Sequence, residues 1–399
     1  MTTISGARVF DGTDVLGTAS VTVEDGVITA VRPGSEHDGD VDGRGMTLLP
    51  GLIDAHVHLR GAGNIGQDLR YGVTTVLDMF SAPPQFTAVL RGRAATRTDE
   101  ADLRSSGLMA GAVDGWPAVI VPPDPSGWHM PGLSRPEDAE QFVVERAREG
   151  SDYIKVFVEN PADVDRPVLS PETVTAVCTA ARAHGLLTVA HAPTRWAFRA
   201  AVDAGVDVLT HLPLDGPLDD DLDLAALVVC PTLAMMRARA DARSTDELLA
   251  DPRLLAGLDR EVADALRAGD RGHLPVSDRP GTSYDHAAEN LARLAEGGAT
   301  ILVGTDANDV PGHAAAVLHG ASMHLELDLL ARAGMSPRQV LRAATSVPAD
   351  VFGLADRGRI APGQRADLLL VAGDPLTDVT ATRDVRAVWR SGVRFSDAR

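Results

Sequence analysis

The sequence predicts an α/β protein: a (β/α)8 barrel of the TIM type and a small β-sandwich domain formed by both chain ends. Three observations lead to this prediction. Short apolar runs alternate with helical patterns through the middle of the chain. Strand-like runs separated by tight turns occupy both ends. Residues able to bind metals stand where the middle strands end.

The two ends of the chain have similar patterns. In the first 50 residues, short apolar runs are separated by Asp11-Gly12 and Asp25-Gly26, and an Asp-Gly pair between two such runs is a strong hairpin signal. Near the C-terminus, strands are expected at 367–371 and 385–389, followed by a Ser391-Gly392 turn. We expect residues 1–50 and 356–399 to form one discontinuous β-sandwich domain. The alternative is two unrelated β-extensions.

Residues 51–355 are expected to form the barrel. Helical patterns, such as 171–183 and 196–204, lie between most of the candidate strands, which are 51–59, 73–80, 106–112, 153–158, 187–192, 207–213, 227–233 and 300–306. Strands that alternate with helices in this way favour a closed parallel barrel over an open sheet. A helical insertion is expected at about 235–285, after the seventh strand. It could be a lid over the active-site mouth or a solvated helical hairpin.

The charge balance, the cysteine content and the apolar runs of the sequence limit the classes of function to be considered. The 37 basic and 56 acidic residues give a net charge of −19 and a pI near 5.0, which disfavours binding to nucleic acid. Cys178 and Cys230 are expected to be small core residues rather than a disulfide. We find neither a signal peptide nor an apolar run long enough to span a membrane. We therefore expect a cytoplasmic protein that acts on a small molecule, with a homodimer as a reasonable oligomeric state.

His56 and His58 close the first apolar strand. Residues at i and i+2 of a strand point to the same face, so both imidazoles can point into the barrel and bind one ion. Imidazole is a favoured zinc ligand. An isolated His-x-His pair is weak evidence of a metal site, but this pair stands at the end of a barrel strand, where active sites form.

Lys155 lies inside the apolar run from Tyr153 to Val158. Burying an ammonium ion is expensive, and burial favours the neutral amine. A neutral amine can react with carbon dioxide to give a carbamate, whose two oxygens suit it to bridge two metals. The simpler alternative is a lysine whose head reaches solvent or a carboxylate.

Three further candidate ligands stand at strand ends. His191 and His211 end the fifth and sixth strands, and Asp306 ends the eighth, which neighbours the first strand in a barrel. A single histidine of this kind is more often a core residue than a ligand. Six such positions in one order point instead to one binuclear site. Two ions roughly 3.5–4 Å apart would lower the pKa of a bridging water and polarise a carbonyl. Asp306 could then carry the proton to the leaving nitrogen.

With these residues in place, the chain resembles the amidohydrolase superfamily, in the subtype whose carboxylated lysine bridges two metals. The resemblance covers nearly the whole chain. It rests on the run from Pro50 to His58, Gly72 to Val76, the strand-end ligands, Gly304-Thr305-Asp306 and two closing runs, Gly358 to Gly363 and Ala366 to Leu368. Within the superfamily the chain is most similar to the imidazolonepropionase-related group, which includes metal-dependent dipeptidases of the prolidase type.

The resemblance implies a role for each residue. His56, His58 and Asp306 would hold the more buried metal, and His191 and His211 the more exposed one. Lys155, as its carbamate, would bridge them, and His129 would contact the substrate carbonyl. The metals are expected to be two divalent ions. Zinc is favoured, although manganese, iron and cobalt suit the same ligands.

The chain departs from this pattern near the sixth strand. His211 is followed by Leu212-Pro213-Leu214-Asp215, which offers an acid where dipeptidases recognise the substrate carboxylate with a polar or basic group. The scarce aromatics Trp116, Trp128, Trp196 and Tyr284 could line a pocket for an apolar substrate group, or simply pack. Trp128 and Tyr284 are the candidates for substrate contact, together with His129.

The sequence therefore predicts a metal-dependent hydrolase that cleaves an amide or cyclic amide C–N bond through a metal-bridging hydroxide. Three alternatives remain. A prolidase-like dipeptidase would keep the same metal centre. A deaminase of this superfamily usually uses one metal and no bridging lysine, so Lys155 argues against it. A non-catalytic relative would have lost ligands that this chain keeps.

Overall fold

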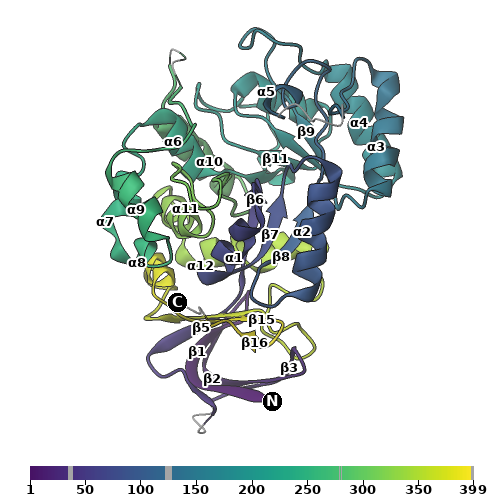
Figure 1. Cartoon of the computed structure of the whole chain (residues 1–399). Helices are drawn as coiled ribbons and strands as arrows, with labels where there is room; N and C mark the ends of the chain where they lie inside the picture. The colour runs from purple at the N-terminus through teal and green to yellow at the C-terminus, as the bar shows by residue number, and fades with distance from the viewer. Residues whose placement is uncertain (35–38, 122–127, 278, 280, 397–399) are drawn as a thin grey trace.

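The computed structural model spans 399 residues, of which 1–34, 39–121, 128–277, 279 and 281–396 are described. Figure 1 shows a barrel surrounded by helices, with a separate sheet beneath it where the two chain ends meet. No helix among the described residues is both long and apolar enough to cross a membrane.

Both chain ends contribute to a single sheet. Its strands run in the order β16-β15-β14-β5-β1-β2-β3, and β4 pairs with β1. They are β1 (Thr2–Phe10), β2 (Val15–Glu24), β3 (Val27–Pro33), β4 (Val41–Asp42), β5 (Met46–Pro50), β14 (Leu368–Ala372), β15 (Val385–Arg390) and β16 (Val393–Arg394). The hairpin expected at Asp25-Gly26 joins β2 to β3, and both residues have the positive φ of a tight turn, 48° and 83°. Trp389 and Ile28 are buried in the core of this sheet.

The barrel strands form two parallel arcs. One consists of β6 (Leu52–Val57), β7 (Val73–Asp78) and β8 (Asp102–Ser105). The other consists of β9 (Ile154–Phe157), β10 (Thr188–His191), β11 (Val208–Thr210), β12 (Val228–Cys230) and β13 (Thr300–Ile301). Isolated parallel bridges, Ala110 with Val156 and Val57 with Ala307, join the arcs on both sides. The strand order is that of a TIM-like barrel.

The third predicted strand is wrong in position. It was expected at 106–112, but regular pairing occupies Asp102–Ser105, and beyond it Ala110 and Ala112 make only isolated bridges, to Val156 and Leu133. Gly107, at φ +63°, interrupts the extended backbone. The strand itself is polar, because buried Asp102 pairs with Arg357, Arg365 and Arg390. An apolar pattern could not reveal it.

The eighth strand is shorter than the predicted 300–306. Only Thr300–Ile301 pairs regularly, and the chain then runs along β6 through separate hydrogen bonds. Ala55 N donates to Val303 O at 2.9 Å, and Asp306 N donates to His56 O at 2.7 Å. These bonds fix Asp306 beside the histidines of β6.

Helices cover the barrel. They are α1 (Ala62–Arg70), α2 (Pro84–Thr96), α3 (Ala139–Arg148), α4 (Pro171–Ala183), α5 (Arg195–Asp203), α10 (Tyr284–Glu296), α11 (Ala321–Arg332), α12 (Pro337–Ala343) and α13 (Ser346–Val351). The helix predicted at 171–183 is confirmed, and it starts where the Ser170 hydroxyl accepts from Thr173 N. The helix predicted at 196–204 lies one residue earlier.

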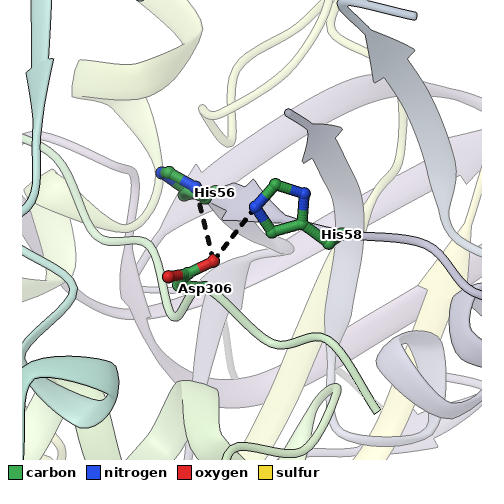
Figure 2. A group of neighbouring side chains, drawn as sticks. All are labelled: His56, His58 and Asp306. Atoms are coloured by element: carbon green, nitrogen blue, oxygen red, sulfur yellow. Dashed lines mark ion pairs between the residues drawn. The ribbon is translucent and has the colours of Figure 1, made fainter. Parts of the chain in front are cut away.

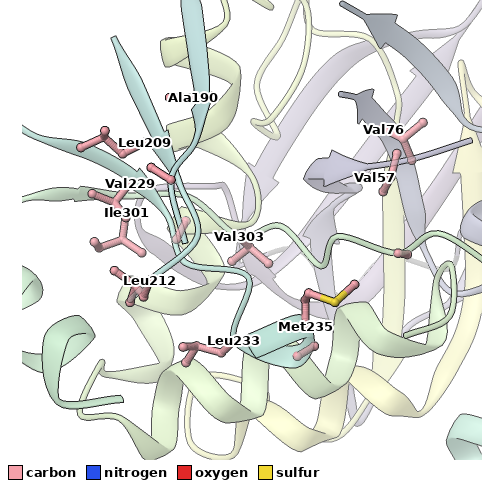
Figure 3. Packing of buried hydrophobic residues seen from close by; sticks show 14 of the residues in the cluster. Val57, Val76, Ala190, Leu209, Leu212, Val229, Leu233, Met235, Ile301 and Val303 are labelled. Carbon is pink, nitrogen blue, oxygen red and sulfur yellow. The ribbon is translucent and has the colours of Figure 1, made fainter. Parts of the chain in front are cut away.

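The predicted insertion is helical. It contains α6 (Leu233–Ala240), α7 (Asp246–Ala250), α8 (Pro252–Leu255) and α9 (Arg260–Arg267). Residues of α7–α9 form a separate apolar cluster with Tyr71 and Leu318. The start of α6 belongs to the main core, where Leu233 and Met235 lie near Leu212 and Val303 (Figure 3). The insertion is therefore anchored to the barrel through α6.

Candidate active site

His56 in β6, His58 directly after β6 and Asp306 beyond the eighth strand form a compact group at one end of the barrel. Asp306 Oδ1 lies 3.1 Å from His58 Nε2 and 3.5 Å from His56 Nε2 (Figure 2). Each residue offers one ligand atom, and these atoms all lie within 4.8 Å of one another, so the three residues could hold a metal ion.

Several ring nitrogens of this group are buried without a hydrogen-bond partner among the described residues, as expected of atoms that bind a metal. His56 is fully buried, and both of its ring nitrogens lack a hydrogen-bond partner among the described residues. His58 Nδ1 is in the same state. Buried polar atoms are nearly always satisfied. Burial lowers the pKa of His56 well below its usual range, which leaves a neutral imidazole able to bind a metal.

Lys155 is the only lysine in the sequence. It lies on β9 with 1% of its surface exposed, and its Nζ donates to Thr210 Oγ1 at 2.9 Å. Burial lowers the pKa of this amine to about 7. A large fraction is therefore neutral near pH 7, which is the form that reacts with carbon dioxide.

His191 and His211 face each other at the ends of β10 and β11. His211 Nε2 lies 2.9 Å from His191 Nδ1, and His211 Nδ1 lies 2.7 Å from Thr232 Oγ1. The rings of His211 and His56 are 5.0 Å apart between centroids. Burial lowers the pKa of both His191 and His211. The second predicted pair of ligands thus adjoins the first group.

The backbone is strained at this site. His211, Thr232 and Asp306 have φ values of 61°, 49° and 59°. This left-handed region costs a residue other than glycine on the order of 1–3 kcal/mol, and such residues cluster at functional sites. Two of the three are predicted metal ligands, and the third touches one.

Asp306 is ionised and its segment is firmly held. Burial alone would raise its pKa, but the hydrogen bond with His58 and the charge of His211 outweigh burial and lower it to about 2. Asp54, which is fully buried, accepts bonds from His56 N, Thr305 N and Thr305 Oγ1 at 3.2, 3.0 and 2.8 Å. The carboxylate of Asp54 therefore ties β6 to the segment that carries Asp306.

Gly304 is required by close packing. A Cβ atom at this position would lie 2.4 Å from Cys230 Sγ and 2.8 Å from both Cβ and N of His56. A larger residue would push His56 or the Asp306 segment out of place.

A cavity of about 450 Å³ opens beside these ligands and includes His58, His191, His211 and Asp306 in its wall. Most of its other lining is apolar: Phe80, Met109, Trp116, Pro117, Phe157, Val164, Pro193, Leu214, Met235, Met236 and Leu274. Its charged lining residues besides the ligands are Arg60, Glu159, Asp215, Arg239 and Arg279. Part of this wall comes from the helical insertion.

The aromatic and loop residues proposed for substrate contact differ in position. Trp116 lines the cavity. Trp128 is half-buried against Phe80 and Met109, which do line it. His129 is exposed. Tyr284 packs at the start of α10 with the Arg237 guanidinium 5.9 Å from its ring, and neither His129 nor Tyr284 is among the described lining residues.

Trp196 and two further histidines, His286 and His324, are not among the described residues that line the cavity. Trp196 is partly exposed in a separate surface groove near α4. His286 Nδ1 lies 2.8 Å from Leu214 O. His324 is buried in α11, within hydrogen-bonding distance of Thr382 and Tyr71. Ser126 and Gly127, which precede Trp128, are outside the described residues.

The sequence analysis missed Glu159. Its Oε1 lies 3.2 Å from His191 Nε2. Burial would raise its pKa, but the hydrogen bond with His191 and the charges of Arg279 and Arg239 lower it. A signal existed, because Glu159 is four residues after Lys155 and residues at even spacing share one strand face. Thr232 was also missed, and nothing in its local sequence marks it.

Comparisons with known proteins identify the family and the fold. The model of the amidohydrolase family matches residues 47–394. The imidazolonepropionase of Salinispora arenicola is 27% identical over 378 residues, which cover 88% of this chain and 85% of that protein. A solved Xaa-Pro dipeptidase with bound methionine has a TM-score of 0.75 at 20% identity over 99% of both chains. The A. niger ochratoxinase has a TM-score of 0.71 at 19% identity, over 98% of this chain and 94% of its own.

The fold and the site define a class, the barrel hydrolases that depend on metal ions. This chain belongs to the amidohydrolase family. It is a metal-dependent hydrolase acting on C–N bonds, and the predictions of family and reaction class are confirmed.

Proposed function

We propose that the protein hydrolyses an amide or cyclic amide bond of a small molecule that carries an apolar group. The observation that carries the proposal is that four of the predicted ligands, His58, His191, His211 and Asp306, line a largely apolar cavity. Such a cavity favours a substrate with an aliphatic or aromatic part over a fully polar one.

The ligand set suits two divalent ions. His56, His58 and Asp306 would hold one ion, and His191 and His211 the other. Lys155, carboxylated on Nζ, would supply an oxygen to each. Zinc is the first choice, and manganese, iron or cobalt would fit the same donors. When bound, the ions activate water as the nucleophile and polarise the scissile carbonyl.

The chain's own residues supply the proton transfer. Asp306 is ionised at neutral pH and faces His58 across 3.1 Å. It would accept the proton of the attacking water and deliver it to the leaving nitrogen. Asp54 and Thr305 hold the Asp306 segment through two hydrogen bonds. The apolar wall would exclude bulk water from the reacting bond.

A prolidase-like dipeptidase is the second candidate, and one observation favours it. Arg60, Arg239 and Arg279 line the same cavity and offer positive charge to a substrate carboxylate. Asp215, the acid noted after His211, instead accepts from Arg195 N at 2.9 Å. An N-acyl amino acid or a dipeptide with an apolar side chain therefore belongs in the substrate screen.

The test is a screen of enzyme prepared with zinc and bicarbonate against N-acyl amino acids, dipeptides, lactams and aryl amides. We expect two zinc ions per chain and hydrolysis of at least one amide class. A preparation that binds no metal and hydrolyses none of these compounds would contradict the proposal. Loss of activity on chelation, with recovery on adding zinc, would tie turnover to the metal.

Several further expectations complete the proposal. The sheet of both chain ends, taken as residues 1–50 and 356–399, would be a β-sandwich domain beside a catalytic barrel of residues 51–355. The protein would work in the cytoplasm on a small-molecule substrate, without nucleic acid or membrane partners, and as a homo-oligomer. The insertion at 235–285 would act as a lid, and His129, Trp128 and Tyr284 would contact substrate once it is bound.

A further inference from the structure

Glu159 stands two residues beyond the end of β9, with 9% of its surface exposed. Its Oε1 lies 3.2 Å from Nε2 of His191. Its Oε2 is buried and has no hydrogen-bond partner among the described residues. Burying a carboxylate is costly unless it is paired. The pairing with His191 therefore accounts for the burial of Glu159.

Phe157 contacts the face of the His191 ring, and Glu159 contacts its edge. Phe157 stacks on it with ring centroids 4.1 Å apart and planes 7° from parallel. With Nε2 directed at Glu159, the other nitrogen, Nδ1, is left facing His211 Nε2 at 2.9 Å. Phe157 at the end of β9 and Glu159 two residues beyond it therefore fix the orientation of this imidazole.

The contacts also define where the protons lie. A neutral imidazole has one donor nitrogen and one acceptor nitrogen. Since a carboxylate only accepts, His191 donates from Nε2 and its Nδ1 is bare. In the metal-free chain His211 Nε2 can then donate to that nitrogen, and Thr232 Oγ1 can donate to His211 Nδ1 across 2.7 Å.

We propose that Glu159 is a positioning residue for the second metal position: its hydrogen bond with His191 keeps Nδ1 of that imidazole bare and turned toward His211. The inference rests on the proposed function, which needs an ion between these two histidines. Binding an ion there would require the His211 proton to lie on Nδ1 instead of Nε2, and this Nδ1–H can donate a hydrogen bond to the Thr232 hydroxyl. The tautomer of His191 needs no change.

Carboxylates that accept the outer N–H of a metal-binding histidine typically account for a 10–100-fold effect on metal affinity. The test replaces Glu159 by Gln, which keeps a neutral acceptor, and by Leu, which keeps the bulk and removes the acceptor. The matched control is Glu140→Gln, because Glu140 also pairs with a histidine, His184 at 2.9 Å, but on the exposed surface.

Two measurements are made on the full chain. The first is zinc binding in competition with a chromophoric chelator. We expect the tighter zinc to bind as in wild type and the weaker zinc to lose roughly 10–100-fold in affinity in Glu159→Leu, with a smaller loss in Glu159→Gln. Glu140→Gln should match wild type.

The second measurement is the ¹⁵N spectrum of histidine-labelled, metal-free protein. We expect one wild-type histidine with Nε2 protonated and Nδ1 bare to become a tautomer mixture in Glu159→Leu. A merely structural role for Glu159 would leave this signal unchanged.

The outcomes separate the two proposals. If wild type binds two zinc ions and both Glu159 variants bind them equally well with an unaltered His191 tautomer, the inference is overturned and the proposed function stands. If wild type itself binds no zinc, both the proposed function and the inference that rests on it are wrong. A graded loss confined to the weaker zinc, with Glu140→Gln unaffected, supports the inference.

Discussion

Replacing Lys155 by methionine should stabilise the metal-free protein. The amine is 1% exposed, and burial lowers its pKa from 10.5 to about 7. Folding therefore either releases the proton of this lysine or buries its charge. Methionine has a similar length and no charge, so it removes this penalty along with the metal-bridging group.

The magnitude follows from the two pKa values. Each pH unit between them corresponds to about 1.36 kcal/mol, so the fall from 10.5 to about 7 amounts to roughly 5 kcal/mol at and below neutral pH. The variant loses the bond from Lys155 Nζ to Thr210 Oγ1, worth about 1 kcal/mol. Repacking around the thioether costs up to about 1.5 kcal/mol more. We expect a net gain of about 2–4 kcal/mol at pH 7.

The assay is equilibrium unfolding by guanidinium chloride in chelator-treated, CO₂-free buffer. Between pH 7 and 10.5 the unfolded chain keeps the lysine proton while the folded chain loses it, so wild-type stability should rise with pH relative to the variant. The advantage of Lys155→Met should thus be largest at and below pH 7 and should shrink toward pH 10.5. The comparison is restricted to the range in which both proteins unfold reversibly.

The refuting result is a metal-free Lys155→Met variant that is less stable than wild type throughout this range. It would mean that the folded chain solvates or pairs the ammonium ion well. The site would then hold no amine ready for carboxylation.

Three other substitutions test the same site. Asp306→Asn should keep the fold, judged by circular dichroism, while kcat falls by about 10²–10⁴-fold; an unchanged kcat would exclude Asp306 as the proton carrier. Lys155→Ala should lose metal, measured by elemental analysis, and short carboxylic acids should partly restore activity; metal retention at the wild-type level would contradict the bridging role. Gly304→Ala should weaken metal binding and lower the unfolding free energy by about 1–3 kcal/mol, because its Cβ would meet His56 at 2.8 Å. Wild-type metal affinity in that variant would show that the segment can move aside.

The sequence was sufficient for the barrel because its signals are local. Apolar strands alternate with helices along the middle of the chain, and in the terminal sheet a hairpin glycine, Gly26, marks the turn between β2 and β3. It failed at β8, whose Asp102 is buried by ion pairs with arginines of the C-terminal segment. Such pairs join residues more than 250 positions apart, and no local pattern encodes them.

The candidate ligands could be predicted because each is a polar residue within or directly after an apolar run. Residues that support them lack such a context. Thr232 acts through a left-handed turn before α6, and Glu159 follows a strand that ends at Phe157. The residues of the cavity wall are harder still to predict. Met235 and Leu274 belong to the insertion, and their place in the wall depends on tertiary packing that no local pattern encodes.

Tyr284 shows why the aromatic candidates are harder to place from the sequence. Its place after a predicted loop suggested a pocket residue, but Ser283 caps α10 there and the ring packs beside Arg237. Trp116 reaches the cavity from an equally uninformative loop. The small number of aromatic residues made each of them a candidate for the pocket. The sequence could not show which of them line the cavity.

The most direct test of the binuclear account uses the single lysine of the chain. Protein labelled with ¹⁵N at lysine Nζ, loaded with zinc and ¹³C-bicarbonate, carries only one site that can give a lysine carbamate signal. We predict one carbamate ¹³C resonance coupled to one ¹⁵N, together with two zinc ions per chain, and loss of that resonance when the metal is removed. Two bound zinc ions with the lysine nitrogen still an amine would contradict the role assigned to Lys155.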